Sequence, residues 1–343
     1  MKKKKNKKFN FLINFIIIFI VLIIVLYFSL KDNYQEILSA ILNMNKLYVL
    51  VAIFILLLYR FLISCSHYII IKTNNELVPL LKCFQINFIV LFFHGITPFA
   101  GGGQPMEIYF LHKEEITVTK STNITLQNFI IYQIALVLVG VFALCYNAIY
   151  GLFPNDNLIK KLVVLGFLVN FLVLLVSFIL SFGKKINRVI CIKGISLLSK
   201  LKIIKDSEKI ENDFNKYLDN FHKNAVKLKK NKKVVLKCIL INIVAILLLY
   251  SMPYFLALGF GLDFTILEGI VATSYVMIMG SFVSIPGGTG GIEYGFVFFY
   301  NYLIKGSILN GLMLVWRFIS YYLGMIIGAI ALFNYRKKVK QWE

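Results

Sequence analysis

Two segments of the chain combine residue types that bind charged groups, because each holds a proline, a glycine cluster and then a glutamate. Residues 97–110 are TPFAGGGQPMEIYF and residues 284–296 are SIPGGTGGIEYGF. The N–H groups of glycine-rich turns and of helix N-termini bind anions. We therefore expect a phosphate-binding role for Gly101, Gly102, Gly103, Gly287, Gly288, Gly290 and Gly291. The alternative is that these glycines only let a tight hairpin pack against neighbouring helices.

Glu107 and Glu293 each lie about three residues into the helix that we expect after the glycines. A carboxylate at that position is favoured by the helix dipole and can cap free N–H groups, which is a structural explanation. Both glutamates are surrounded by apolar sequence, however, where an ionisable side chain usually faces a cavity or a partner charge. We therefore favour a functional or ion-pairing role.

Arg60 and Arg317 are the candidate partners, because each lies near the middle of a long apolar run. An arginine there is ~11 residues, or ~16 Å, from either end of its helix, which is too far for its guanidinium to reach water comfortably. A buried guanidinium pairs with a carboxylate or a phosphate. One hypothesis pairs Arg317 with Glu293 and Arg60 with Glu107 permanently. The other is that a lipid phosphate competes for the arginines.

Other reactive residues do not form a recognisable site. His67 and His94 could relay protons or bind phosphate, although a packed, hydrogen-bonded role is more common for a lone membrane histidine. The five cysteines are scattered without C-x-x-C spacing, and no G-x-x-x-x-G-K-[ST] loop is present. We expect no metal site, no cofactor and no direct ATP hydrolysis.

The elements that must position these residues are membrane helices. The chain has 343 residues, of which 59% are hydrophobic, and its mean hydropathy is +0.78. Soluble domains average about 45–50% apolar residues. The net charge of +21 comes largely from lysines at the ends of apolar runs, which indicates topology signals and contact with an anionic membrane surface rather than nucleic acid.

Six apolar runs are long enough to cross a bilayer, and two further regions are interrupted in the middle. The runs are 11–30, 47–71, 124–148, 159–182, 234–258 and 306–334, and the interrupted regions are 79–116 and 264–304. The first run follows KKKKNKK and is too long for a cleaved signal, so we expect an uncleaved span.

Charge decides how the interrupted regions cross. Residues 183–233 carry 15 Lys and Arg against 5 Asp and Glu, so they belong on the cytoplasmic side. Residues 183–233 reach the cytoplasmic side if region 79–116 enters the membrane from the cytoplasm and returns to the cytoplasm. By the same reasoning, region 264–304 enters from outside and returns to the outside. The prediction is an all-α polytopic protein with six full spans, two re-entrant hairpins and cytoplasmic termini.

The domain organisation follows from this topology. Residues 1–182 form a first membrane half, and 234–343 form a second, each with one hairpin. The Pro-to-Glu spacings of nine and seven residues suggest a degenerate inverted repeat, which in transporters brackets a midplane binding site. Between the halves, 183–233 has apolar residues at helical spacing among lysines, which fits a basic amphipathic helix on the membrane surface or a solvated linker helix.

The two motifs, followed by Trp316 and Arg317 in the last span, resemble the transmembrane family of bacterial lysylphosphatidylglycerol synthase/flippase, the multiple peptide resistance factor. The resemblance covers nearly the whole chain. It implies movement of aminoacylated phosphatidylglycerol across a bacterial cytoplasmic membrane, resistance to cationic antimicrobial peptides, and functional roles for Glu107, Glu293 and Arg317. The sequence given ends at Glu343, so we expect no aminoacyltransferase domain within it.

Three functions follow as expectations. The first is a flippase-like protein that binds a phospholipid such as lysylphosphatidylglycerol between the hairpins. The second is a part in phosphatidylglycerol lysyltransfer, alone or with a soluble aminoacyltransferase partner. The third is a membrane scaffold that does not transport, in which the charged pairs are structural. The headgroup, the energy source and the oligomeric state are left open.

Overall fold

A computed structural model describes residues 34–154, 157–189, 231–281, 283 and 285–340, together with the isolated positions 193, 215, 219 and 222. The predicted first span at 11–30 and most of the predicted linker helix at 183–233 lie outside the described residues. Every regular element in the described ranges is helical, and none is a strand.

Long apolar helices dominate the described part of the chain, after a short helix α2 (Tyr34–Asn43). They are α3 (Lys46–Thr73), α6 (Val118–Tyr150), α7 (Asn157–Phe182), α10 (Lys232–Gly259), and a last span built from α13 (Ile308–Arg317), a π-helical turn (Phe318–Leu323) and α14 (Gly324–Lys340). A helix of 28 residues is about 42 Å long, which exceeds the roughly 30 Å of a hydrocarbon core. The predicted all-α polytopic membrane fold is confirmed.

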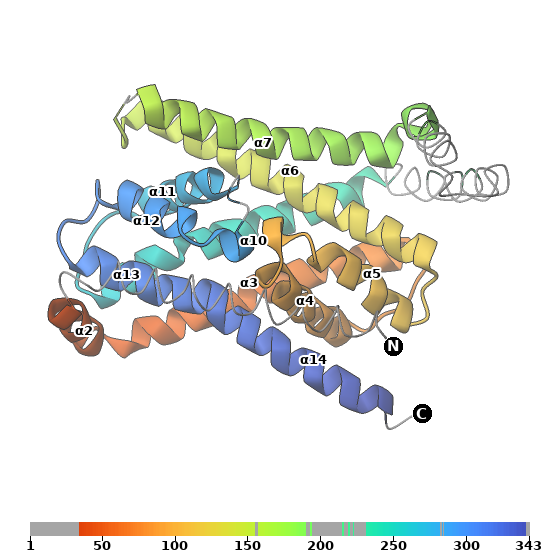
Figure 1. Ribbon diagram of the computed structural model, residues 1–343, viewed down its shortest axis with the longest axis horizontal. Coiled ribbons are helices and arrows are strands. Elements are labelled where there is room, and N and C mark those ends of the chain that lie inside the picture. The colour runs from red at the N-terminus through yellow and green to blue at the C-terminus, as the bar shows by residue number, and fades with distance from the viewer. Residues whose placement is uncertain are drawn as a thin grey trace.

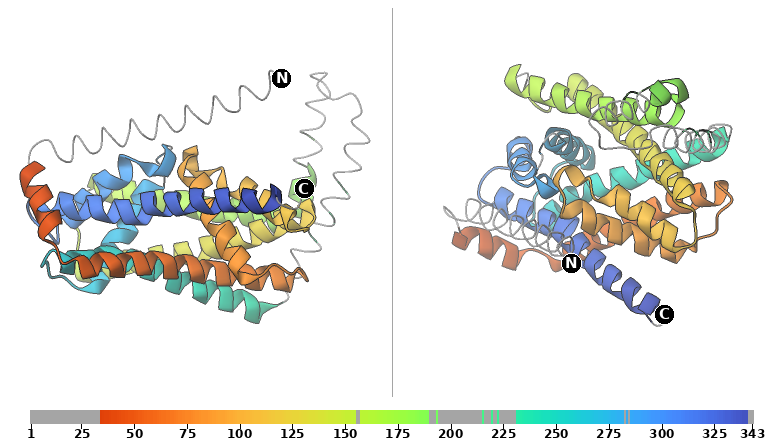
Figure 2. Two further views of the ribbon diagram at one scale, coloured as in Figure 1. Left: turned by 90° about the horizontal axis from the view of Figure 1, so that it is seen from below. Right: turned by 45° about the vertical axis from the view of Figure 1, so that its right-hand side comes forward.

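Each interrupted region forms two short helices joined by an irregular tip. The first comprises α4 (Leu80–Gly95), the 3₁₀ turn η1 (Pro98–Ala100) and α5 (Gly103–Lys113); the second comprises α11 (Ile266–Gly280), η2 (Pro286–Gly288) and α12 (Gly291–Tyr300). In both, the two helices pack against each other, and the tips η1 and η2 are in contact. The hairpins lie in opposite halves of the molecule along its long axis (Figures 1 and 2).

The helix ends that the charge pattern assigns to the cytoplasm lie together in the structure. The C-terminal ends of α7 and α14 and the start of α10 lie at one end of the molecule, on the right in Figure 1. The tip of α11–α12 points toward that end, whereas α4–α5 begins and ends there. Entry of the two hairpins from opposite faces of a membrane stays a prediction, because the structure contains no membrane.

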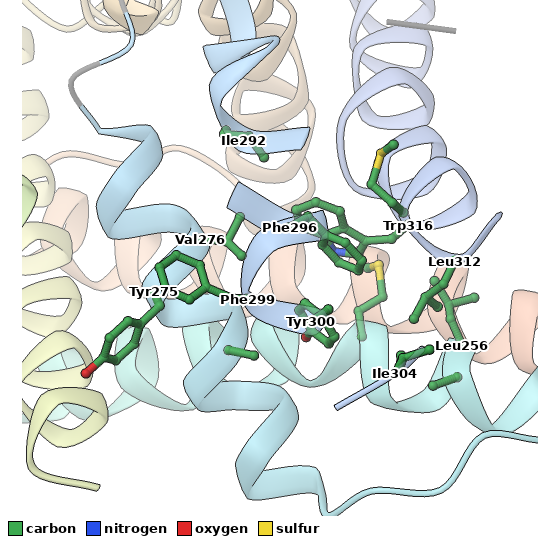
Figure 3. Packing of buried hydrophobic residues seen from close by; sticks show 14 of the residues in the cluster. Leu256, Tyr275, Val276, Ile292, Phe296, Phe299, Tyr300, Ile304, Leu312 and Trp316 are labelled. Atoms are coloured by element: carbon green, nitrogen blue, oxygen red, sulfur yellow. The ribbon is translucent and has the colours of Figure 1, made fainter. Parts of the chain in front are cut away.

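Aromatic packing covers one side of the second hairpin. Phe296 of α12 stacks on Trp316 of the last span with ring centroids 4.7 Å apart, and on Tyr300 at 4.2 Å. The same cluster includes Phe299 and Leu256 and joins α10, α11, α12 and α13 (Figure 3). Irregular backbone at membrane depth is tolerated where protein surrounds it, and this aromatic packing provides that enclosure for the helix next to η2.

Candidate functional site

Arg317 pairs with Glu293, as one of the two hypotheses from the sequence expects. The Nε atom of Arg317 donates to Glu293 Oε1 at 2.7 Å, and both side chains are buried, at 6% and 5% exposure. A terminal nitrogen of the guanidinium donates to the carbonyl oxygen of Gly287. The other carboxylate oxygen of Glu293 accepts from the N–H of Gly290 at 2.6 Å, so Glu293 caps α12 and holds Arg317 at the same time.

Tyr321 extends this arrangement to the first hairpin. It lies in the π-helical turn, with its ring centroid 4.3 Å from the central carbon of the Arg317 guanidinium, and its hydroxyl donates to the carbonyl oxygen of Gly95 at 2.7 Å. Gly95 is the last residue of α4. Arg317 and Tyr321, on one span, thus contact the tips of both hairpins. We call Arg317, Glu293, Gly287 and Tyr321 the Arg317 clamp.

Glycine is required in the second cluster by backbone conformation and by space. Gly287, Gly288 and Gly290 have φ angles of 70°, 63° and 90°, which L side chains rarely adopt. A Cβ atom on Gly287 would lie 2.2 Å from the Tyr321 ring, and one on Gly291 would lie 2.3 Å from a methyl group of Val283. The sharp turn and the close approach of the last span therefore depend on these residues.

The first cluster uses its glycines differently. Its positive φ angles fall on Phe99 (51°) and Ala100 (54°), not on the glycines that follow. A Cβ atom on Gly103 would lie 2.1 Å from the His94 ring, and one on Gly102 would lie 2.5 Å from Thr97. These glycines let α5 begin directly against the end of α4.

Several loop amides already have partners within the chain. Gly101 N–H donates to Pro98 O at 3.0 Å, Gly102 N–H to Thr97 Oγ1 at 2.8 Å, and Gly288 N–H to Ile285 O at 2.8 Å. Gly290 N–H donates to Glu293, as described above. Few of the glycine N–H groups are therefore free to bind a phosphate in the way that the sequence suggests. Close packing explains the presence of many of the glycines in both clusters.

Glu107 lies in the second turn of α5, beyond the capping positions, and its partner is His67 rather than Arg60. The distance between His67 Nε2 and Glu107 Oε1 is 3.0 Å, and the two residues are 1% and 7% exposed. His67 and Arg60 are both on α3, seven residues apart, which is about 10.5 Å along the helix axis. The Glu107 side chain therefore contacts α3 at the level of His67.

Arg60 has no carboxylate within ion-pair distance among the described residues. One terminal nitrogen donates to Asn87 Oδ1 of α4 at 3.2 Å, and the guanidinium lies 4.8 Å from the centroid of the Tyr59 ring. Its Nε atom is buried and has no hydrogen-bond partner within the described ranges. The proposed pairing of Arg60 with Glu107 is thus absent, and the two arginines differ: Arg317 is paired and Arg60 is not.

A cavity of about 330 Å³, which we call the polar chamber, contains Arg60. Its polar and aromatic wall comprises Tyr59, Arg60, Asn87, His94, Phe99, Gln104, Glu107, Asn128, Phe129 and Tyr132. Asn128 Oδ1 is also buried, and no described residue bonds to it. Buried polar atoms in folded proteins nearly always have partners, so this chamber has the donors and acceptors for a polar ligand or for water.

A second cavity, of about 290 Å³, adjoins the polar chamber, because Phe99, Ala100 and Tyr132 line both. We call it the apolar chamber. It lies between α6, α7, α11 and the tip η2, and its wall is mostly apolar: Leu136, Val137, Phe167, Met277, Ile278, Val283, Ile285 and Ile292. Gly287 and Gly288 of the second cluster also border it. The tip η1 thus borders both chambers, and the tip η2 borders the apolar chamber.

Several residues of this site were not singled out from the sequence. Asn87, Asn128 and Tyr132 line the polar chamber, and Tyr321 joins the two hairpins. The available signal was an amide side chain inside an apolar run, which is costly without a partner. His94, by contrast, has the packed role that is common for histidine, with Nδ1 donating to Ala100 O at 2.5 Å.

Comparisons with known proteins agree with this architecture. The chain is 21% identical over 313 residues to a protein named UPF0104 membrane protein from Archaeoglobus fulgidus, which covers 82% of this chain and 86% of the relative. Residues 12–328 match the family model described as the lysylphosphatidylglycerol synthase TM region. That match covers both hairpins, both arginines and all the predicted site residues, and the chain therefore belongs to the lysylphosphatidylglycerol synthase TM region family.

Proposed function

We propose that the protein binds a phospholipid by its phosphate in the polar chamber and moves it across the membrane between the two hairpins. The observation that carries this proposal is the Arg60 guanidinium, which has no carboxylate partner among the described residues and lies in a chamber that adjoins an apolar one. A guanidinium binds phosphate through two parallel hydrogen bonds, and Arg60 has a free buried Nε for one of them.

The shape of the paired chambers favours an amphiphile over a free ion. The polar chamber offers Arg60 and amides from Asn87, Gln104 and Asn128, whereas the apolar chamber offers only a few hydroxyl and amide groups among apolar side chains. A lipid can place its headgroup in the first and part of a chain in the second. The family description, which names lysylphosphatidylglycerol, supports a phospholipid of that kind, including an aminoacylated one.

The Arg317 clamp has a different role in this proposal. Its charges are already neutralised, so it holds the tips of the hairpins together rather than binding the headgroup. The hairpins enter from opposite faces, and access alternates when the contact between η1 and η2 opens. The protein then acts in the cytoplasmic membrane, where export of a cationic lipid lowers the attraction of the surface for cationic peptides.

Translocation in liposomes tests the proposal. The purified chain is reconstituted, and the movement of a labelled phosphatidylglycerol between leaflets is followed by chemical quenching. We expect Arg60→Gln to lose most translocation and Arg60→Lys to keep part of it, because a lysine retains the charge without the paired donors. The matched control is Lys305→Gln, which removes an exposed cation beside Tyr302, outside both chambers. Translocation by Arg60→Gln at the control rate would refute the site.

A further inference from the structure

A buried histidine and a buried carboxylate are in contact at the wall of the polar chamber. His67 Nε2 and Glu107 Oε1 are 3.0 Å apart, which is within ion-pair distance, and neither atom has a hydrogen-bond partner among the described residues. Glu107 lines the chamber, whereas His67 lies behind it, almost fully covered. An ion pair at this depth is costly for the fold unless both charges are compensated, so its protonation matters for the chamber as a whole.

The proton on this pair sets the net charge of the chamber. Arg60 contributes one positive charge and Glu107 one negative charge. With a neutral imidazole, the sum over Arg60, Glu107 and His67 is zero; with one proton added to the pair, the sum is +1. A phosphate that enters next to Arg60 is opposed by the Glu107 carboxylate in the first state and favoured in the second, because charges inside a protein interact more strongly than charges in bulk water.

The surroundings leave His67 as the group best placed to take up that proton. The other ionisable side chains near the chamber and the pair are Tyr59, Arg60 and Cys65 on α3, Cys83 and His94 on α4, Tyr132 on α6, and Cys238 on α10, whose thiol contacts Ser66. Imidazole is the side chain that ordinarily changes charge between about pH 5 and 8. His94 uses Nδ1 to donate to a carbonyl oxygen, and it forms no ion pair with a carboxylate in the part of the chain that the structure describes.

We propose that His67 and Glu107 form a proton-binding site that is coupled to phosphate binding at Arg60, so that a lipid headgroup enters the polar chamber together with one proton. This inference rests on the proposed headgroup site and adds a coupling ion to it. Coupling is reciprocal: if protonation tightens phosphate binding, bound phosphate raises the proton affinity of the pair by the same factor. A pH gradient could then drive the movement of the lipid.

Calorimetric titration of the purified full chain with a water-soluble, short-chain phosphatidylglycerol tests this coupling. The phosphodiester does not itself titrate in the range used, about pH 6 to 8. We expect lipid binding by the wild-type protein to tighten by at most about tenfold for each pH unit by which the pH is lowered. We also expect the protein to take up one proton per lipid bound. Proton uptake is measured by repeating the titration in buffers of different ionisation enthalpy.

Substitutions of the pair should shift binding in opposite directions. Glu107→Gln removes the opposing charge, so it should bind tightly at both ends of the pH range. His67→Gln removes the imidazole that takes up the proton, so the charge of the Glu107 carboxylate stays uncompensated. This variant should bind the lipid weakly at both ends of the pH range. His112→Gln is the matched control, because His112 lies at the end of α5 and its Nδ1 bonds to Ile116 O. It should keep the wild-type slope.

Each other outcome has a definite meaning. Binding by the wild-type protein that is the same at every pH, or a slope that disappears in His94→Gln and persists in His67→Gln, would overturn the coupling. If Arg60→Gln binds as well as wild type, the headgroup site itself fails, which is a separate result. If His67→Gln does not fold, Glu107→Gln still decides, because its amide keeps the size of the side chain and its predicted effect is a gain.

Discussion

Removal of the charge on Arg317 should destabilise the protein far more than removal of a surface charge. Arg317→Met leaves Glu293 buried at 5% exposure, with Gly290 N–H as its remaining partner, and removes the bond to Gly287 O. Breaking a buried ion pair by deleting one partner typically costs about 3–5 kcal/mol. We expect a loss of that size in the free energy of unfolding, measured by denaturant titration in detergent.

The double variant shows whether the loss comes from an uncompensated charge. Arg317→Met with Glu293→Gln removes both charges, and the glutamine carbonyl can still accept from Gly290 N–H. We expect the double variant to lose about 2 kcal/mol less than the sum of the two single losses, which is within the range of coupling energies for residues in contact. Lys120→Gln is the control, since Lys120 pairs with Glu76 at the surface, is 44% exposed, and should lose no more than about 1 kcal/mol.

The reasoning would be refuted if Arg317→Met lost less than about 1 kcal/mol, or if the losses of the two single variants simply added up. Additive losses would mean that Arg317 and Glu293 do not depend on each other, and that the clamp is only a set of neighbouring contacts. An exchange of the two residues, Arg317→Glu with Glu293→Arg, should not restore stability, because arginine cannot accept the hydrogen bond of Gly290.

The remaining predictions concern the contact between the hairpins. Tyr321→Phe removes the bond to Gly95 O and should cost about 1 kcal/mol of unfolding free energy. In the same variant, a cysteine pair placed across η1 and η2 should form a cross-link more slowly than it does when Tyr321 is present. Gly103→Ala should reduce the yield of folded protein or its melting temperature, because the added methyl group would meet the His94 ring, whereas Gly101→Ala should be tolerated, since its nearest neighbour would be 3.4 Å away. Equal effects of the two alanines would contradict this packing argument.

Much of the fold follows from simple properties of the sequence. Long apolar runs predict spanning helices because a helix satisfies its backbone hydrogen bonds within one segment, and five such spans are present in the described residues. Proline and glycine near positions 98–103 and 286–291 predict breaks, and the structure turns at both. These features depend on local sequence, which explains why they could be foreseen.

The partners of the charged residues depend on how helices align, which local sequence does not encode. Glu107 could have met Arg60 if α5 lay two turns further along α3, and it meets His67 instead. Likewise, the positive φ angles of the first tip fall on Phe99 and Ala100, although glycines follow immediately. Both outcomes are set by tertiary packing, here by the close contact of Gly103 with His94.

A structure of the protein in lipid nanodiscs that contain phosphatidylglycerol would test the central claim most directly. We expect density for a lipid phosphate within about 3 Å of the Arg60 guanidinium, with Arg317 still paired to Glu293. Density for the phosphate at Arg317, with Glu293 displaced and the polar chamber filled only by water, would contradict it.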